Sequence, residues 1–288
     1  MKKTLLGLMT LLLPLTINAQ LISVQPGTGR TETKKDTKKE AKKESKKESK
    51  KVEASVEADI VSHYIWRGQD LAGFSIQPSA SVSWRGLSLT AEGSASLDKD
   101  DYQEMDLTLG YQLGPVNIGV SDYWCTGIDS ENRYLYYDKL NGGHKFEGNL
   151  GFSCKYFSLQ GYCMFWGNDW KIQKNSGEAL KRGYSTYIEL GVPFRLGNLD
   201  WQLTVGGTPM ESGGTWEVIE REHPEYGLRE TTTRVYEYAE GPACCLASLR
   251  CTKNLDLGKL SIPVFAEINT NPYLSKGTFL FGLSIKPW

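Results

Sequence analysis

The chain has 288 residues, of which 40% are hydrophobic and 23% charged, and its formal net charge is −1. Without a net basic charge, we expect no nucleic-acid partner. Beyond the first residues no segment approaches the roughly 20 consecutive apolar residues of a membrane-spanning helix, which excludes a helical membrane protein. If the chain crosses a membrane, it must do so as a closed barrel, because lipid satisfies no backbone polar group.

Residues 1–19 have the layout of a cleavable secretory signal. A basic head of Lys2 and Lys3 precedes an apolar run over residues 5–15, and Ile17-Asn18-Ala19 follows it. This run is too short to be a membrane anchor. We therefore expect export from the cytoplasm and a mature chain that begins near Gln20.

Residues 20–52 form a Lys/Glu-rich arm of low complexity. A four-residue repeat of two lysines, an acidic residue and a small residue runs over residues 34–49. Nothing in this repeat can be buried, so the arm should be solvated, either disordered or a frayed helix. Two interpretations stay open: a plain spacer, or an electrostatic contact of Lys34–Lys51 with anionic lipid or cell-wall polymer.

Residues 53–288 alternate between apolar and polar residues with a period of two, which predicts antiparallel strands. Most of the segments have the nine to eleven residues that a tilted strand needs to cross a bilayer. We expect an all-β fold, a transmembrane up-and-down barrel of about 12 strands. The predicted strands are 53–66, 74–85, 87–98, 103–113, 115–125, 144–154, 156–166, 182–194, 199–209, 242–252, 259–269 and 277–287.

The connections between these segments alternate in length. Short turns follow every second strand, whereas the others tend to be longer, notably 126–143, 167–181 and 210–241. This asymmetry is typical of outer-membrane barrels, with periplasmic turns, extracellular loops and both termini in the periplasm. Aromatic residues near the strand ends predict two interfacial belts: Trp66, Trp124, Phe146 and Phe165 at the loop side, and Trp84, Tyr111, Phe157, Phe194 and Trp201 at the turn side.

The final segment alternates through Phe279, Phe281, Leu283 and Ile285, and the chain stops at Trp288. A last strand that closes on an aromatic residue resembles the assembly signal of outer-membrane proteins. We therefore expect the outer-membrane assembly machinery and outer-membrane lipid to be partners of this chain.

The stretch Ser62-His63-Tyr64-Ile65-Trp66-Arg67-Gly68, followed by Ile76-Gln77-Pro78, resembles the start of the barrel in the TorF-type family of outer-membrane porins. Residues 104–111 and 144–147 resemble further strands of that family. The resemblance covers most of residues 53–288 and leaves out the arm. It implies a pore-like role in the outer membrane and names no substrate.

If the apolar face meets lipid, the polar face lines the lumen. Residues 52–288 carry 29 acidic and 20 basic side chains, so we expect an acidic lumen that favours cations. The predicted lining residues are Glu57, Asp59, His63, Arg67, Arg85, Glu92, Glu104, Asp106, Glu147, Glu189 and Glu267, with Arg250 on the same face.

Two of the basic residues also have a structural interpretation. Arg85 falls near Glu57 of the adjacent strand, so the pair could neutralise each other. For Arg67 we favour a clasp to Asp70 or to loop carbonyls over a solute contact at the pore mouth.

The sequence favours a porin that passes small polar or cationic solutes. The alternative is a filled or plugged barrel whose extracellular loops, above all 210–241, bind a partner or glycan, and a soluble secreted β-sandwich is the third interpretation. We expect no enzyme, because the three histidines offer no clear serine partner. We also expect no cofactor and no metal site. The six cysteines predict no particular pairing.

Overall fold

The structure is a computed structural model that describes residues 52–97, 102–126, 133–139, 142–173, 181–223, 227–258 and 260–286. The predicted signal sequence (1–19) and nearly all of the arm (20–52) lie outside these residues, so both stay predictions. Within the described part of the chain, no helix is long and apolar enough to cross a membrane.

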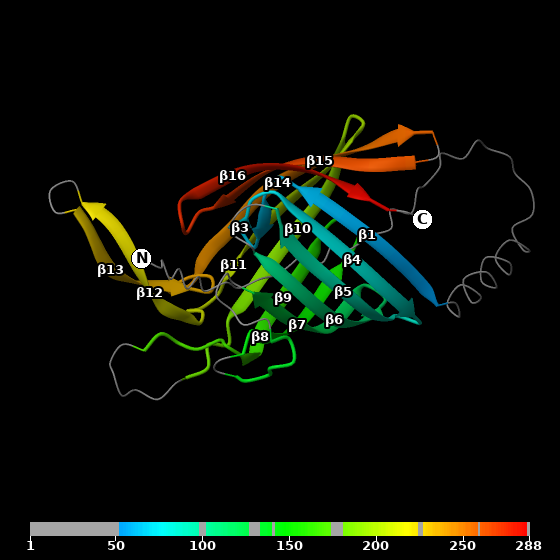
Figure 1. Cartoon of the computed structure of the whole chain (residues 1–288). Coiled ribbons are helices and arrows are strands. Elements are labelled where there is room, and N and C mark those ends of the chain that lie inside the picture. Colours follow the sequence, from blue (N-terminus) through cyan, green and yellow to red (C-terminus); the bar gives the residue numbers. More distant parts are fainter. Residues whose placement is uncertain are drawn as a thin grey trace, which may run out of the picture.

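Twelve antiparallel strands form a closed barrel, which confirms the predicted fold class and strand number (Figure 1). Around the barrel the order is β1, β16, β15, β14, β11, β10, β9, β8, β7, β6, β5 and β4. The strands are β1 (Glu53–Val61), β4 (Ser75–Trp84), β5 (Leu87–Ser96), β6 (Gln103–Leu113), β7 (Val116–Thr126), β8 (His144–Ser153), β9 (Ser158–Gly167), β10 (Thr186–Leu196), β11 (Leu199–Thr208), β14 (Ala243–Leu257), β15 (Leu260–Asn271) and β16 (Lys276–Ile285).

The first strand closes the cylinder. β1 pairs with β4 from Glu53↔Ser83 to Val61↔Ser75 and with β16 from Ala58↔Ile285 to Val61↔Gly282. Each barrel strand therefore has a hydrogen-bonded neighbour on both sides, and no edge strand is left open. The interpretation as a soluble sandwich is wrong, because the twelve strands form one closed sheet and not two stacked ones.

The alternation of the sequence sorts the side chains between the two faces. Along β6 exposed Met105, Leu107 and Leu109 alternate with buried Glu104, Asp106 and Thr108. The same apolar exterior continues around the barrel through Val82, Leu89, Ile118, Leu150, Leu190, Leu203, Ile268, Phe279 and Phe281. An exposed apolar band around a polar interior inverts the arrangement of a water-soluble protein and suits a lipid environment.

The loop lengths follow the predicted alternation. At one end the chain turns within a few residues, at 85–86, 114–115, 154–157, 197–198 and 258–259. At the other end the connections are longer, at 62–74, 97–102, 127–143, 168–185 and 209–242, and only 272–275 is short. We call these ends the turn side and the loop side.

In the described part of the chain two hairpins stand outside the barrel wall. Neither is predicted as a hairpin, although the first of them begins within the predicted strand 53–66. β2 (Tyr64–Trp66) and β3 (Gln69–Ala72) form a small separate sheet, which we call the inner hairpin. β12 (Gly214–His223) and β13 (Gly227–Tyr236) pair over their full length within the predicted loop 210–241. The β12–β13 hairpin extends away from the barrel (Figure 1).

Candidate functional site

The inner hairpin turns within two residues, Arg67 and Gly68. Their φ angles are 45° and 81°, and Trp66 pairs with Gln69 across the turn. Two positive φ values in succession are the conformation that a two-residue hairpin requires, and glycine adopts it without steric cost. The sequence Arg-Gly thus folds the chain back after Trp66, where the predicted first strand would have ended.

The tip of the inner hairpin reaches across the lumen. A Cβ atom added to Gly68 would lie 1.9 Å from the backbone oxygen of Cys245 in β14, so the two backbones are in direct contact. From the same hairpin Tyr64 contacts β6 and Arg67 contacts β8. The inner hairpin therefore spans the interior between opposite parts of the barrel wall.

Arg67 is the centre of a buried cluster. Its guanidinium donates from Nη1 and Nη2 to the two oxygens of Glu147, at 3.0 Å each, and Nη1 also donates to the Tyr238 hydroxyl. Four aromatic rings surround the guanidinium carbon, at 4.1 Å (Tyr162), 4.5 Å (Tyr187), 4.9 Å (Trp66) and 5.3 Å (Tyr238). We call these six residues the Arg67 cluster. Only a well-paired cation is stable at such a depth.

A loop segment seals the cluster from the loop side. Glu237 and Tyr238 follow β13, and the Glu237 carboxylate accepts a hydrogen bond from Lys145 Nζ at 3.0 Å. Gln69 of the inner hairpin donates to the Glu237 backbone oxygen at 2.8 Å. Burial, only partly offset by Lys145, raises the pKa of Glu237 to about 7. The loop and the inner hairpin thus close the interior together.

Two predicted lumen carboxyls lie beneath the inner hairpin. The hydroxyls of Tyr64 and Tyr102 donate to Glu104 at 2.9 Å and 3.1 Å. Asp106 lies two residues further along β6, on the same face and fully buried. In the described part of the chain neither carboxyl forms an ion pair. They are therefore part of the packing around the hairpin and not of an open channel.

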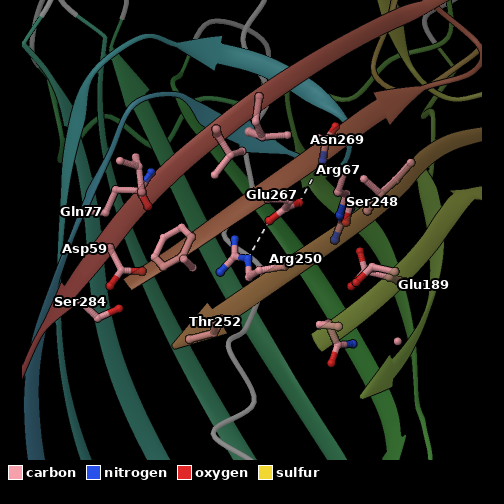
Figure 2. A pocket seen from close by; sticks show the side chains of 18 of the residues that line it. Asp59, Arg67, Gln77, Glu189, Ser248, Arg250, Thr252, Glu267, Asn269 and Ser284 are labelled. Atoms are coloured by element: carbon pink, nitrogen blue, oxygen red, sulfur yellow. Dashed lines mark hydrogen bonds and ion pairs between the residues drawn. The ribbon is translucent and has the colours of Figure 1, made fainter. Parts of the chain in front are cut away.

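A chamber of about 480 Å³, lined by both polar and apolar side chains, lies in the interior below the inner hairpin. Its roof includes Arg67 and Gly68, and its lining extends to Cys154 and Phe157 at the β8–β9 turn. The volume is in the range of sites that hold a small molecule. Figure 2 shows side chains that line the chamber: Asp59 and Ser284 at one side, Glu189 at the other, and Arg250 between them.

The chamber has more acidic than basic groups. Glu57 pairs with Lys286 at 3.0 Å, and Arg250 Nε donates to Glu267 at 2.6 Å, as Figure 2 marks. The remaining carboxylates of the lining, Asp59, Glu92 and Glu189, form no ion pair within the described residues. An uncompensated negative charge in a low-dielectric wall attracts cations.

Apart from Arg85, the structure places the predicted lumen residues at three positions in the interior. Glu57, Asp59, His63, Glu92, Glu189 and Glu267 line the chamber, as does Arg250. Arg67 and Glu147 form an ion pair in the Arg67 cluster, which borders the chamber. Glu104 and Asp106 lie under the inner hairpin.

Arg85 is a correction. It lies in the turn between β4 and β5 with a φ of 52°, where its exposed side chain rests on the Trp84 ring at 4.8 Å. A turn residue leaves the alternation of the strand, so Arg85 neither lines the lumen nor neutralises Glu57, whose partner is Lys286.

The expected clasp between Arg67 and Asp70 is also wrong. Asp70 instead lies 3.1 Å from His63 at the loop side, and Arg67 turns inward to Glu147, 80 residues further along the chain. The hairpin places Arg67 at its tip and Asp70 on its returning strand, which separates the two side chains.

One of the predicted belt residues lies elsewhere. Trp66 is not part of an interfacial belt, because the inner hairpin carries it inside, where it is fully buried. Cys245 of β14 is buried as well, next to a bulge opposite Gly206 and Gly207 that shifts the register of that strand. The six cysteines, all of them in the described ranges, are free.

A signal for the inner hairpin does exist in the sequence. Trp-Arg-Gly occurs twice, as Trp66-Arg67-Gly68 and as Trp84-Arg85-Gly86, and both copies form two-residue turns with positive φ. The second copy is readily predicted as a turn because a strand follows it. The first could have been recognised from the second.

Catalytic and metal-binding arrangements find little support. His144 Nδ1 lies 2.8 Å from Asp122, but its other ring nitrogen contacts the Tyr134 backbone oxygen, so a serine hydroxyl has no free nitrogen to use. No group of three or more His, Cys, Asp or Glu within the described ranges could hold a metal ion.

Comparison with known proteins adds little to this picture. No family model and no curated protein matches the sequence, so the resemblance to the TorF-type family stays a prediction. Among solved structures, a protein from work on the in-meso crystallization of membrane proteins is similar at a TM-score of 0.37 and 9% identity, over 81% of this chain and 82% of that one. A porin refined at 1.8 Å resolution is similar at a TM-score of 0.33 and 13% identity, over 75% of this chain and 63% of the porin.

The geometry itself defines the class. A closed up-and-down barrel with an apolar exterior, a polar interior and loops sorted by length is a transmembrane-type β-barrel. Its interior holds an acidic chamber that ends at a buried arginine cluster.

Proposed function

We propose that this protein is an outer-membrane barrel of the porin type, which passes small polar solutes and favours cations. In the present conformation the inner hairpin closes its lumen. Both termini face the periplasm in this proposal, because β1 begins and β16 ends on the turn side. The arm would then lie in the periplasm, where Lys34–Lys51 can contact anionic lipid or cell-wall polymer.

One observation carries the proposal: the closure is built separately from the wall. The twelve barrel strands pair with one another without β2 and β3, which form a sheet of their own. The Arg67–Glu147 ion pair, the Tyr64–Glu104 hydrogen bond and the packing of Gly68 on β14 hold the inner hairpin in place. The hairpin can therefore leave the lumen without breaking the barrel ladder.

The chamber favours a barrel that lets a solute pass over a barrel whose interior is filled by side chains. It holds about 480 Å³ of space lined by carboxylates, amides and hydroxyls together with apolar side chains, and three of its carboxylates have no ion pair in the described residues. A narrow passage with unpaired acidic groups concentrates cations and repels anions.

Conductance in planar bilayers tests this function. Purified wild-type protein should give small or rare channel events, and a variant in which a short Gly-Ser turn replaces residues 64–72 should give larger, persistent ones. A matched control shortens the outlying β12–β13 hairpin (residues 214–236) and should leave the conductance unchanged. If the variant without the inner hairpin folds and stays silent, the barrel is not a channel.

A second function has its own support. The inner hairpin crosses the lumen between β14 and the strands β6 and β8. The β12–β13 hairpin extends beyond the barrel (Figure 1). A plugged barrel that displays this hairpin to an extracellular partner or glycan fits the same geometry. If this second function is correct, deletion of the β12–β13 hairpin should abolish binding to the extracellular partner or glycan. Removal of the inner hairpin should not affect that binding.

A further inference from the structure

We propose that Glu147, Tyr162, Tyr187 and Tyr238 form a binding site for the guanidinium or ammonium group of a solute, and that Arg67 occupies this site as an internal stand-in. The inference rests on the proposed function for its solute, a small cation that enters the lumen. It assigns to that solute a chemical class and a place within the barrel.

The arrangement around Arg67 has the components of a cation receptor. A carboxylate binds the guanidinium through two hydrogen bonds of 3.0 Å, and three tyrosine rings lie 4.1 to 5.3 Å from its central carbon. Bidentate pairing and contact with aromatic faces are the two interactions that recognise guanidinium and substituted ammonium groups. The cluster combines them in a site shielded from water.

The walls of this site belong to elements other than the inner hairpin. Glu147 belongs to β8, Tyr162 to β9 and Tyr187 to β10, and Tyr238 follows β13. The Tyr123 hydroxyl also donates to Glu147, at 3.4 Å, and holds the carboxylate from the barrel side. If Arg67 leaves, only Trp66 goes with it, and a carboxylate between three tyrosines remains.

A cation can reach this site from the chamber. Arg67 and Tyr162 form part of the chamber lining, and Glu189 lines it on the neighbouring strand β10. The unpaired carboxylates of the chamber raise the local concentration of cations next to the cluster. A solute that binds Glu147 in place of Arg67 would release the tip of the inner hairpin, so binding and opening would be coupled.

The test removes the stand-in and supplies the cation from outside. Arg67→Ala retains the β-carbon, and ethylguanidinium restores the atoms that the substitution deletes. Titration calorimetry of the folded variant in detergent should show saturable binding of one ethylguanidinium, at least tenfold tighter than to the wild type, in which Arg67 competes. Ethylurea, which has a similar shape and no charge, should not bind.

Two further variants locate the site. The double variant Arg67→Ala, Glu147→Gln should lose the binding, because the carboxylate is gone. Arg182→Ala is the matched control: Arg182 rests on the Trp170 ring at 4.3 Å in a loop, but has a backbone oxygen as its hydrogen-bond acceptor instead of a carboxylate. Arg182→Ala should bind ethylguanidinium no more tightly than the wild type does. Equal affinity of Arg67→Ala for ethylguanidinium and ethylurea would overturn the proposal.

A folding readout covers the case in which Arg67→Ala does not fold alone. Refolding this variant with ethylguanidinium should then restore the yield, and ethylurea should not; equal yields also overturn the proposal. Binding in detergent is independent of conductance, so the two proposals fail separately. A variant that binds the cation and never conducts rejects the channel, and a conducting barrel that does not bind it rejects the site.

Discussion

The Arg67 guanidinium and the Glu147 carboxylate form two hydrogen bonds, with Nη1–Oε2 and Nη2–Oε1 both 3.0 Å apart. Both side chains are buried, and the pair joins the tip of the inner hairpin to β8. Because the hairpin has no ladder bonds to the barrel, side-chain contacts such as this ion pair hold it in place. Loss of the ion pair should release the hairpin before it unfolds the barrel.

Glu147→Gln should undock the inner hairpin. Removing one partner of a buried ion pair costs about 3–5 kcal/mol, because the other charge stays buried without compensation. Arg67 avoids this cost if the hairpin moves into water, so trypsin should cut after Arg67 much faster than in the wild type. Glu57→Gln is the control, since its partner Lys286 is at the turn side and half-exposed. Wild-type resistance to trypsin in Glu147→Gln would contradict the assignment.

Gly68→Ala should destabilise the same contact by a backbone effect. Gly68 has a φ of +81°, a conformation that costs an alanine about 1–2 kcal/mol. The added Cβ would also meet the Cys245 backbone oxygen at 1.9 Å, so the hairpin tip must move away from β14. Faster tryptic cleavage after Arg67 should report the movement.

The control for that substitution is Gly241→Ala. An added Cβ at Gly241 meets nothing within 4 Å, and the residue does not have a positive φ. Urea unfolding and tryptic resistance of Gly241→Ala should match the wild type. If Gly68→Ala behaves like Gly241→Ala, the contact between the hairpin tip and β14 does not stabilise the closed state.

The sealing loop should become less stable as the pH rises. Burial raises the pKa of Glu237 from an ordinary 4.5 to about 7, so between these values the folded loop binds more protons than the unfolded one. Stability is thus greatest below pH 4.5 and falls as the pH rises towards 7, by at most about 1.4 kcal/mol per pH unit. Hydrogen exchange of the 237–239 amides, measured between pH 5 and 8 and corrected for intrinsic rates, should show this loss of protection.

The substitution Glu237→Gln should flatten that pH dependence, because it removes the titrating group. Glu240→Gln removes an exposed carboxylate from the same loop and should leave the profile as in the wild type. A profile in Glu237→Gln that keeps the wild-type slope would assign the pH dependence to another group.

The barrel could be predicted from the sequence because its determinants are local. Period-two alternation fixes which side chains share a face, and turn residues such as Gly114 and Gly197 fix where a strand ends. The twelve predicted segments match the twelve strands, with shifts at their ends. The largest are at 53–66, where the barrel strand stops at Val61, and at 242–252, where β14 continues to Leu257; β10 starts at Thr186 instead of residue 182.

The candidate site was harder to predict because it depends on contacts between distant residues. Alternation correctly separates Glu147 and Glu189 from the apolar face, but it does not show that a short hairpin enters the lumen and takes Arg67 to Glu147. Nothing local distinguishes the inward turn at Arg67-Gly68 from the outward turn at Arg85-Gly86. The difference lies in what each turn meets: β14 and three tyrosines for the first, and solvent with Trp84 for the second.

Removing two unpaired carboxylates from the chamber should reduce its preference for cations. Asp59→Asn and Glu189→Gln delete charges that have no ion pair in the described residues, whereas Glu57 and Glu267 are already compensated. In the variant without the inner hairpin, the cation-over-anion permeability ratio should fall several-fold. The reversal potential in a potassium chloride gradient measures this ratio. Arg85→Gln, in an exposed turn, should not change it, and an unchanged ratio in the double carboxylate variant would place the selectivity elsewhere.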